Sequence, residues 1–366
     1  MSILDTIRRL VECESPSADH AAVERSAELV AQLGTQLLGT PPERIEVDGV
    51  AHLRWRFGAV TRVLLLAHHD TVWPIGTLRR LPYAVRDGIL TGPGCFDMKT
   101  GLAMALHAVA ALDERDGVTL LVTGDEEVGS ARSRALIEET ATGARAALVL
   151  EASADGGALK GARKGVSLYE ASVTGRAAHA GLEPEKGINA TVEVAHLAIA
   201  AAALGDDAAG TTVTPTLASS GTTTNTVPAA ARLWIDVRAR TAAELQRVDA
   251  ALRAFTPVTR ETSIRIDGGI NRPPLESRMS AALYALAARL AERSGLPLPA
   301  SVAVGGASDG NFTAGMGVPT LDGLGAVGGG AHAEDEHVVV AEIAPRTRLL
   351  AELVAEISRT DEPWRS

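Results

Sequence analysis

Residues 63–70 read VLLLAHHD, an unbroken apolar run that ends in two histidines and an aspartate. The runs TLLV at 119–122 and AALVL at 146–150 have the same character, and helical patterns fill 98–112 and 130–139 between the runs. Continuous β-branched and leucine runs that alternate with helices are typical of βαβ units, whose sheet is buried on both faces. The sequence therefore predicts an α/β domain with a mixed, largely parallel sheet flanked by helices.

A second pattern begins after the segment GARKG at residues 161–165. The predicted elements that follow are ordered β-α-β-β-α-β, and they lie at 167–173, 188–204, 213–218, 231–238, 242–255 and 263–266. This order is that of a ferredoxin-like α+β sandwich. After residue 275 the helical patterns return. We therefore predict an inserted domain of residues 164–269 within a larger domain of residues 1–163 and 270–366.

The composition is that of a globular protein, since 46% of the 366 residues are hydrophobic and 22% are charged. A net charge of −10 argues against general binding to nucleic acids or anionic membranes, because both require a basic face. Cys13 and Cys95 cannot form a disulfide framework, which indicates a reducing compartment. The apolar stretches fall short of the roughly 20 residues that span a bilayer, and residues 1–17 do not resemble a secretory signal. We expect a cytoplasmic protein with neither a membrane nor a nucleic-acid partner.

Polar side chains follow each of the predicted parallel strands. His68 and Asp70 follow the first run, Glu126 and Glu127 follow the second, and Glu151 follows the third. In an open parallel sheet the carboxyl ends of the strands border one crevice, so we expect these side chains at one rim.

Two further candidates lie outside the strands. Asp97, in the motif GPGCFDMKTG, precedes a predicted helix whose positive dipole end favours a carboxylate. His332 follows the glycines at 328–330, where the backbone can turn sharply. Carboxylates gathered in one cleft repel one another, and divalent cations would offset that repulsion. Imidazole and carboxylate ligands without cysteine suit Zn²⁺, with Mn²⁺ or Co²⁺ as substitutes, and two cations sharing a carboxylate would use the whole set.

Each of these residues alone has an ordinary structural explanation. A single histidine after a strand is usually a satisfied surface or core residue. A Glu-Glu pair is most often the solvated start of a helix or a loop. The joint arrangement at several strand ends is much harder to explain in that way, and it favours a metal site.

Several motifs spread along the chain carry a resemblance to a known family. They are AHHDTVWP (67–74), GPGCFDMKTG (92–101), GDEEVGS (124–130), LVLEAS (148–153), GRAAHAGLEPEKGINA (175–190), GGASDGNFTA (305–314) and GGGAHAEDE (328–336). On these motifs the chain resembles the co-catalytic zinc aminoacylase/carboxypeptidase family, and within it the bacterial glutamate carboxypeptidase branch.

The resemblance implies a role for each candidate ligand. Asp97 would bridge two Zn²⁺ ions in each subunit. His68 and Glu151 would complete the protein ligands of one ion. Glu127 and His332 would complete those of the other.

Two neighbouring carboxylates would assist these ligands. Asp70 would hold the ring of His68 and its tautomer. Glu126 would be the general base, taking a proton from the attacking water and passing it to the leaving nitrogen. The resemblance also implies a cis peptide bond after Asp97.

The inserted domain would act as a lid and would form a homodimer. By the same resemblance, the partner subunit's His179 would polarise the scissile carbonyl; the alternative is a loop histidine beside Gly181. Asn225, in GTTTNTVP, would contact the substrate, or it would be an ordinary turn residue.

Two arginines could bind a carboxylate of the substrate with both ends of the guanidinium. These are Arg272 and Arg238, for each of which a surface ion pair is the alternative. Arg163 could act in the same way or could simply lie at a hinge. By the same resemblance, Gly306 belongs to a loop whose glycines would permit close approach of the backbone to the substrate; a plain loop is the alternative.

The metal site together with the resemblance implies a two-zinc metallohydrolase that releases a C-terminal amino acid of glutamate type from a peptide or an N-acyl amino acid. The enzymatic alternative is an N-acyl amino acid deacylase, of the acetylornithine deacetylase or succinyl-diaminopimelate desuccinylase type. The alternative outside the enzymes is a catalytically silent protein that binds amino-acid derivatives. The presence of Glu126 argues against this last alternative, because a protein that only binds metal does not need its carboxylate.

Overall fold

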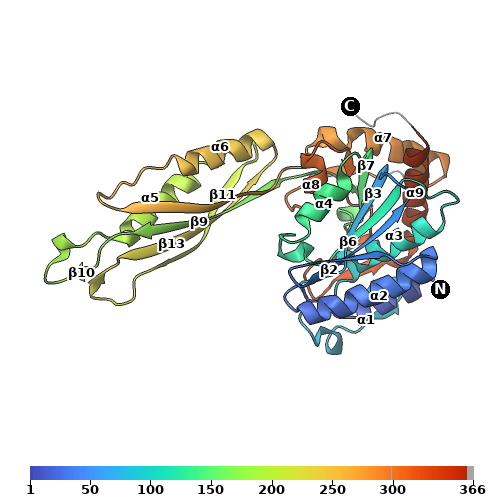
Figure 1. The fold of residues 1–366 in the computed structure, drawn as a ribbon, viewed down its shortest axis with the longest axis horizontal. Coiled ribbons are helices and arrows are strands. Elements are labelled where there is room, and N and C mark those ends of the chain that lie inside the picture. Colours follow the sequence, from blue (N-terminus) through green and yellow to red (C-terminus); the bar gives the residue numbers. More distant parts are fainter. Residues whose placement is uncertain (298, 361–366) are drawn as a thin grey trace. The chain divides into compact units, whose positions relative to one another are not determined.

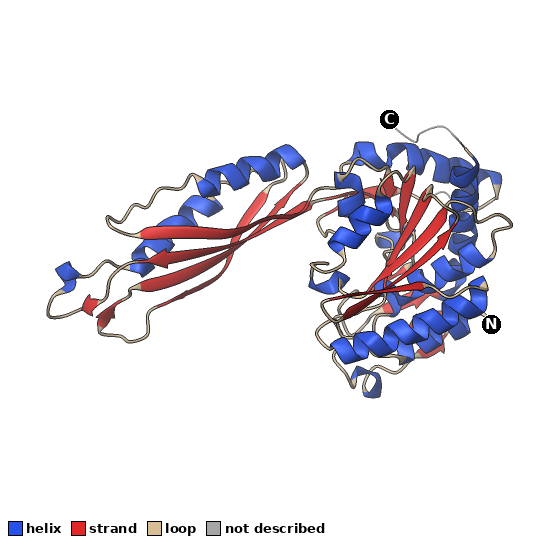
Figure 2. Ribbon diagram, viewed as in Figure 1, coloured by secondary structure: helices blue, strands red, loops and turns tan. Residues whose placement is uncertain are grey.

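The computed structural model describes residues 1–297 and 299–360. The chain forms two compact units, one of Met1–Arg163 together with the chain from Leu275 onward, and one of Lys164–Pro274 (Figure 1). Each unit has its own main sheet (Figure 2). Each also has its own apolar core.

The sheet of the first unit is mixed and largely parallel, which confirms the predicted fold class. Within the described residues its order is β1-β2-β6-β3-β7-β16. The strands are β1 (Glu43–Val47), β2 (Val50–Phe57), β3 (Val63–His68), β6 (Val118–Thr123), β7 (Ala146–Val149) and β16 (Thr320–Leu321). β3 pairs in parallel with β6 and β7, and β7 with β16, whereas β1 and β2 are antiparallel additions at one edge. The three apolar runs of the sequence are therefore neighbouring strands.

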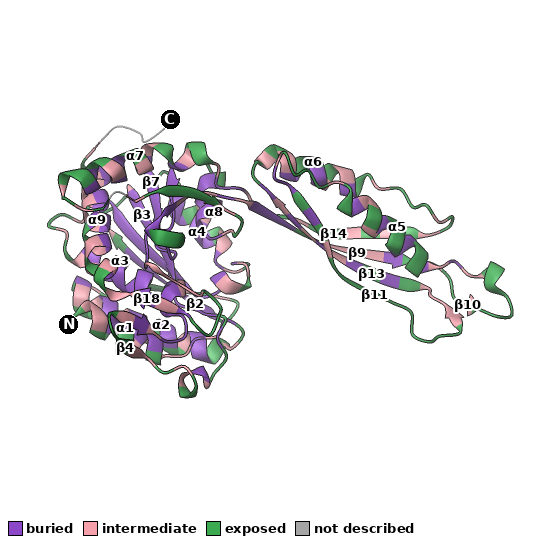
Figure 3. Ribbon diagram, turned by 180° about the vertical axis from the view of Figure 1, so that it is seen from behind, coloured by how far each residue is buried: buried purple, intermediate pink, exposed green. Residues whose placement is uncertain are grey.

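Helices cover both faces of this sheet. Those of the first face are α1 (Ile3–Glu12), α2 (His20–Leu38), α3 (Thr100–Ala110), α7 (Ser277–Arg293) and α9 (Val340–Arg359), and those of the second are α4 (Arg134–Ala141) and α8 (Gly310–Gly315). Leu65 of β3 belongs to the core on the first face, and Leu64 and Leu66 belong to the core on the second. Successive side chains of a strand point to opposite faces, so every residue of β3 is buried (Figure 3). This explains the unbroken apolar run.

Short elements surround the strand ends of the first unit. β4 (Ala84–Arg86), β5 (Ile89–Thr91), β17 (Gly328–Gly329) and β18 (His337–Val339) form a small antiparallel sheet, and β8 (Leu159–Arg163) pairs in parallel with β15 (Ser301–Val304). The helical turns are η1 (Thr77–Arg79), η2 (Cys95–Lys99), η3 (Glu126–Val128) and η4 (Asp155–Gly157). Among the helices described, none combines the length and the apolar character that crossing a bilayer demands.

The second unit has the predicted order β-α-β-β-α-β. Its elements are β9 (Gly165–Thr174), α5 (Ala190–Ala202), β11 (Thr212–Ser220), β13 (Ala230–Ala239), α6 (Ala242–Arg253) and β14 (Ser263–Arg272), with β10 (Ala178–His179), η5 (Pro184–Lys186) and β12 (Thr226–Val227) as small additions. The antiparallel sheet has the order β11-β13-β9-β14. Both helices pack on one face of it, because Val194, Leu245 and Val237 belong to one core.

The second unit ends later than its predicted boundary at residue 269, because β14 continues well past the predicted segment 263–266. Gly268 and Gly269 interrupt the apolar pattern in this strand, and both have positive φ. A Cβ atom at Gly268 would lie 2.2 Å from the carbonyl oxygen of Leu168, so the close pairing with β9 requires glycine.

Candidate metal centre

Three adjacent strand ends supply most of the predicted ligands. His68 is the last residue of β3, Glu126 and Glu127 lie in η3 just after β6, and Glu151 follows β7 by two residues. β3 lies between β6 and β7 in the sheet, and all three run in parallel. Their carboxyl ends therefore form one rim, as the sequence predicts.

A close helix–strand contact brings Asp97 to the same rim. Asp97 lies just before α3, and Gly101 in the first turn of α3 packs on the end of β7. A Cβ atom at Gly101 would lie 2.0 Å from the carbonyl oxygen of Leu150, so glycine permits this approach. The peptide bond that follows Asp97 is cis, as the family resemblance implies.

The carboxylate of Asp97 lies between two imidazoles. Its Oδ1 is 3.5 Å from His68 Nε2, and its Oδ2 is 3.3 Å from His332 Nε2. The same two ring nitrogens each face a glutamate as well, since Glu151 Oε1 lies 3.6 Å from His68 Nε2 and Glu127 Oε2 lies 3.1 Å from His332 Nε2. The structure thus brings the five predicted ligands together, with one carboxylate shared by two histidine–glutamate pairs.

The atoms at this rim fit a divalent cation. His68 Nε2 and Asp97 Oδ1 are buried and have no hydrogen-bond partner among the described residues. Leaving such atoms without a partner costs free energy, which a cation between them would offset. His68, Glu126 and Glu151 offer ligand atoms within 4.8 Å of one another, and so do His68, Asp97 and Glu127. Nitrogen and oxygen ligands without thiolate suit Zn²⁺.

The charges of the site depend on one another. Hydrogen bonds with Asp97 and Glu127 raise the pKa of His332 to about 10. Burial acts to raise the pKa of Asp97, but the nearby rings of His332 and His68 outweigh burial and hold this pKa well below its usual value. The carboxylates thus favour the protonated form of the His332 ring in the protein alone. A cation bound by these residues would compete with that proton, because histidine binds metals in its neutral form.

Asp70 supports both His68 and the segment after β6. His68 Nδ1 donates to the backbone carbonyl of Asp70 at 3.0 Å, and the nearer carboxylate oxygen lies 3.4 Å away. A carbonyl oxygen only accepts, so Nδ1 carries the proton and Nε2 faces the other carboxylates. The Asp70 carboxylate also accepts from Ser17 Oγ at 2.6 Å and from the N–H groups of Glu126 and Glu127, each at 3.2 Å.

The contacts of Arg163 lie within the first unit. Its guanidinium makes a two-pronged bond to Asp322, at 2.7 and 3.0 Å, and donates to the carbonyl of Gly306 at 3.1 Å. Nη2 lies 3.7 Å from Glu151 Oε2. These contacts give Arg163 a bracing role beside Glu151, and they do not favour its binding a substrate carboxylate.

The second unit brings His179 and Asn225 together. β10, which contains His179, pairs with β12, and the carbonyl of Asn225 accepts from the residue after His179 at 2.9 Å. His179 Nδ1 accepts from the N–H groups of Gly181 and Leu182, both at 3.1 Å. In the neutral ring the proton therefore sits on Nε2, which is then a donor. Both candidates are exposed.

The two candidate arginines of the second unit flank one residue. Arg238 on β13 and Arg272 on β14 both lie opposite Val166 of β9, and directly opposed residues share a face of the sheet. The guanidinium of Arg238 bonds to Asp236 at 2.8 and 2.9 Å, and Arg272 is buried. Their binding of substrate stays a prediction.

Glu336 is a residue that the sequence reasoning missed. It is 3% exposed, and it accepts hydrogen bonds from the loop that carries Asp97. Burial raises its pKa, although those hydrogen bonds oppose the change. The sequence feature that could have indicated Glu336 is its position shortly after His332. This feature does not distinguish Glu336 from Glu334, which is also a glutamate.

A family model covers the whole of this site. The model for peptidase family M20/M25/M40 matches residues 64–356, which include every candidate ligand. The chain belongs to this family. The resemblance predicted from the motifs is thereby confirmed, and the chain is an enzyme of this metallopeptidase family.

Relatives of the family cover nearly the full chain. Carboxypeptidase G2 of Pseudomonas sp. (strain RS-16) is 30% identical over 377 aligned residues, covering 97% of this chain and 89% of that protein. Succinyl-diaminopimelate desuccinylase 2 of Shewanella loihica is 28% identical and covers 88% of this chain and 93% of its own length. The solved structure of the M20 family metallo-carboxypeptidase Sso-CP2 from Sulfolobus solfataricus has a TM-score of 0.76 at 16% identity, covering 98% of this chain and 99% of that one. Aminopeptidase PepT from Bacillus cereus has a TM-score of 0.75 at 23% identity, with 98% of both chains covered. These structures share the fold.

Proposed function

We propose that this chain is a two-zinc metallocarboxypeptidase that releases a C-terminal amino acid of glutamate type from a peptide or an N-acyl amino acid. The observation that carries the proposal is the Asp97 carboxylate, whose oxygens face His68 and His332 at 3.5 and 3.3 Å. A shared carboxylate between two histidine–glutamate pairs suits a pair of cations. The 30% identity to carboxypeptidase G2 supports a carboxypeptidase activity.

Glu126 is the residue that moves protons in this proposal. Two bound Zn²⁺ ions would supply Lewis acidity toward the amide carbonyl and a water of lowered pKa. The buried Glu126 carboxylate takes a proton from the attacking water and delivers it to the leaving nitrogen. Asp70 accepts a hydrogen bond from the Glu126 N–H at 3.2 Å and so fixes the backbone from which this side chain projects.

The second unit supports the proposal of a homodimer. β11 is an edge strand, and an edge offers unpaired backbone groups to another chain. Beside it, α5 exposes Ile199 and Val192 on one side, and β11 exposes Leu217. In the dimer the partner subunit's His179 donates its Nε2–H to the scissile carbonyl.

The second candidate function is an N-acyl amino acid deacylase. The similarity to succinyl-diaminopimelate desuccinylase 2 over 88% of this chain favours it. Both reactions hydrolyse an amide with the same ligands and the same base, so the residues that contact the acyl and amino-acid groups decide between them.

The deciding experiment measures turnover on matched substrates and metal content on the same sample. We expect two zinc ions per chain and the highest kcat/KM on folyl- or peptidyl-glutamate. Faster turnover of acetylornithine or succinyl-diaminopimelate would reverse the order of the two functions. Remetallated protein that holds no divalent ion at Asp97 in an anomalous-scattering map would refute both.

A further inference from the structure

The carboxylate of Glu336 lies at the centre of the loop that carries Asp97. Its Oε1 accepts hydrogen bonds from the backbone N–H groups of Phe96 and Asp97, at 2.8 and 3.0 Å. Its Oε2 accepts from the N–H of Gly94 at 2.8 Å and from the indole N–H of Trp73 at 2.7 Å. Each oxygen of this buried carboxylate thus accepts two hydrogen bonds from the described part of the chain.

The loop depends on an acceptor from outside itself. Its backbone leaves helical geometry at Asp97 (φ −114°, ψ 97°) and Met98 (φ −129°, ψ 32°), so a regular ladder of helix hydrogen bonds does not run through it. Buried N–H groups need partners. A charged carboxylate that satisfies several of them at once is a strong anchor for the path of the loop. That path determines where the Asp97 side chain starts.

Glu336 also joins two segments that carry candidate ligands. It lies shortly after His332, and the next residue, His337, begins β18. β18 pairs with β5, with His337 opposite Thr91, and β5 leads into the Asp97 loop. A backbone ladder and the Glu336 carboxylate therefore hold the His332 segment against the Asp97 segment.

We propose that Glu336 is a positioning residue that holds the Asp97 carboxylate between His68 and His332 and thereby sets the affinity for the metal. Its contacts are with backbone and indole N–H groups, so it acts through Asp97. The inference rests on the proposed function, since the position of Asp97 matters only if Asp97 is a ligand.

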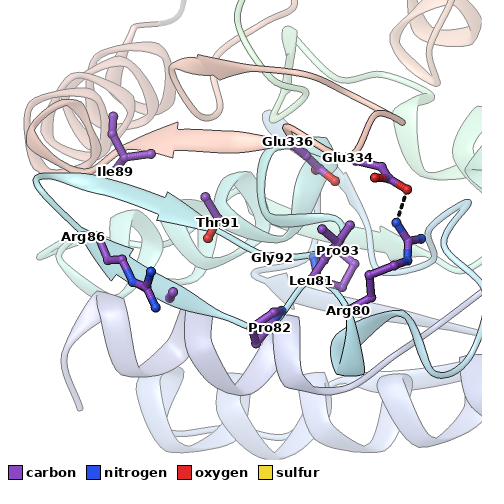
Figure 4. A pocket seen from close by; sticks show the side chains of 11 residues that line it. Arg80, Leu81, Pro82, Arg86, Ile89, Thr91, Gly92, Pro93, Glu334 and Glu336 are labelled. Carbon is purple, nitrogen blue, oxygen red and sulfur yellow. Dashed lines mark hydrogen bonds and ion pairs between the residues drawn. The ribbon is translucent and has the colours of Figure 1, made fainter.

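Glu336 also lines a cavity of about 370 Å³, which makes a specific test possible (Figure 4). Pro93 and the ion-paired Arg80 and Glu334 line the same cavity. Replacing Glu336 by alanine would enlarge this cavity by the volume of the carboxylate. The N–H donors of the loop would then face the enlarged cavity. A small carboxylate such as formate could then take over the lost hydrogen bonds, because clustered N–H groups bind anions.

The experiment measures Zn²⁺ affinity by chelator competition and the melting temperature of the metal-free protein. Glu336→Ala is expected to weaken Zn²⁺ binding about 10–100-fold, and formate is expected to restore part of it in a saturable manner. Glu336→Gln fills the space with an amide, so it is expected to bind Zn²⁺ weakly and not to respond to formate. Glu334→Gln is the matched control with wild-type affinity expected, because Glu334 is exposed on the same loop.

Wild-type affinity in folded Glu336→Ala and Glu336→Gln proteins would overturn the proposal. A formate response in the wild-type and Glu334→Gln proteins as large as that of Glu336→Ala would also overturn the proposal. If Glu336→Ala does not fold, Glu336→Gln decides, and its unchanged affinity counts against the proposal. Asp97→Asn separates the two hypotheses: unchanged affinity there refutes the proposed function, whereas weakened affinity there with intact binding in the Glu336 variants refutes only the positioning role.

Discussion

Four of the five candidate ligands of the first unit are largely buried and only His332 among the five is half exposed, whereas His179 and Asn225 of the second unit both lie exposed on or beside a short strand pair. His68 is fixed through Asp70, and Asp97 through the loop around Glu336. His179 has a fixed tautomer but no side-chain partner in the contacts described for it. Packing prepares the first set before any ligand binds. In the proposed function, the second set would gain a defined environment from the substrate and from the partner subunit.

The largest expected effect is on Glu126, in the well-held region. Glu126→Gln removes the carboxylate that moves protons and keeps its shape, so kcat should fall about 10²–10⁴-fold. Zinc content should stay at the wild-type level, because in the proposal Glu126 is not a ligand. Steady-state kinetics and metal analysis on one preparation give both numbers. Wild-type turnover would remove Glu126 from the mechanism.

The second-largest effect is expected at His179, in the exposed region. His179→Ala should lower kcat about 10²–10³-fold, the cost of losing one donor to the developing oxyanion. Stability should hardly change, because the side chain is exposed. Mixing His179→Ala with Glu126→Gln should restore part of the activity, since a mixed dimer contains one intact site. Failure to restore activity would speak against donation across subunits.

A smaller effect is expected at Asp70. Asp70→Asn replaces an acceptor of the Ser17, Glu126 and Glu127 hydrogen bonds by a donor. Zinc affinity should therefore fall about 10–100-fold. Asp19→Asn is the control, because Asp19 caps α2 and asparagine caps equally well. Equal zinc affinity in the two variants would show that Asp70 does not support the site.

The smallest effect is expected at Glu193, a carboxylate that can be compared with Glu336. Glu193, on α5 of the second unit, also accepts backbone hydrogen bonds, from the N–H groups of Val258 and Thr259 at 3.0 and 2.6 Å. Burial raises its pKa, but these bonds lower it by more, so the pKa of the folded protein lies below the usual 4.5. Its stabilisation is therefore present above pH 4.5 and is lost as pH falls through the lower folded value.

Glu193→Gln should lower the free energy for opening α5 by about 1–3 kcal/mol at pH 7. Hydrogen exchange of the α5 amides measures this, and the difference from wild type should shrink in acid. Zinc affinity should not change, because Glu193 lies in the second unit. A loss of zinc affinity as large as that of Glu336→Ala would mean that such carboxylates act through general stability.

The fold could be predicted where the sequence pattern is local. The runs at 63–67, 119–122 and 146–150 lie in or overlap adjacent parallel strands, because a sheet buried on both faces demands unbroken apolar runs. The end of β14 could not be predicted, since Gly268 and Gly269 have no side chains that would continue the pattern of a strand. Only pairing with β9 makes them part of a strand.

The amino-acid sequence alone indicates which residue types stand at the strand ends, and therefore the chemistry of the site. Histidine and carboxylate at those positions follow from local pattern and from the direction of parallel strands. The tertiary structure was needed to show that Asp97 is shared by two histidine–glutamate pairs and that Glu336 holds its loop. Glu334 and Glu336 stand two positions apart with the same chemistry, yet one pairs with Arg80 at the surface and the other is buried in the Asp97 loop. The difference comes from contacts between segments far apart in the chain, which no local pattern encodes.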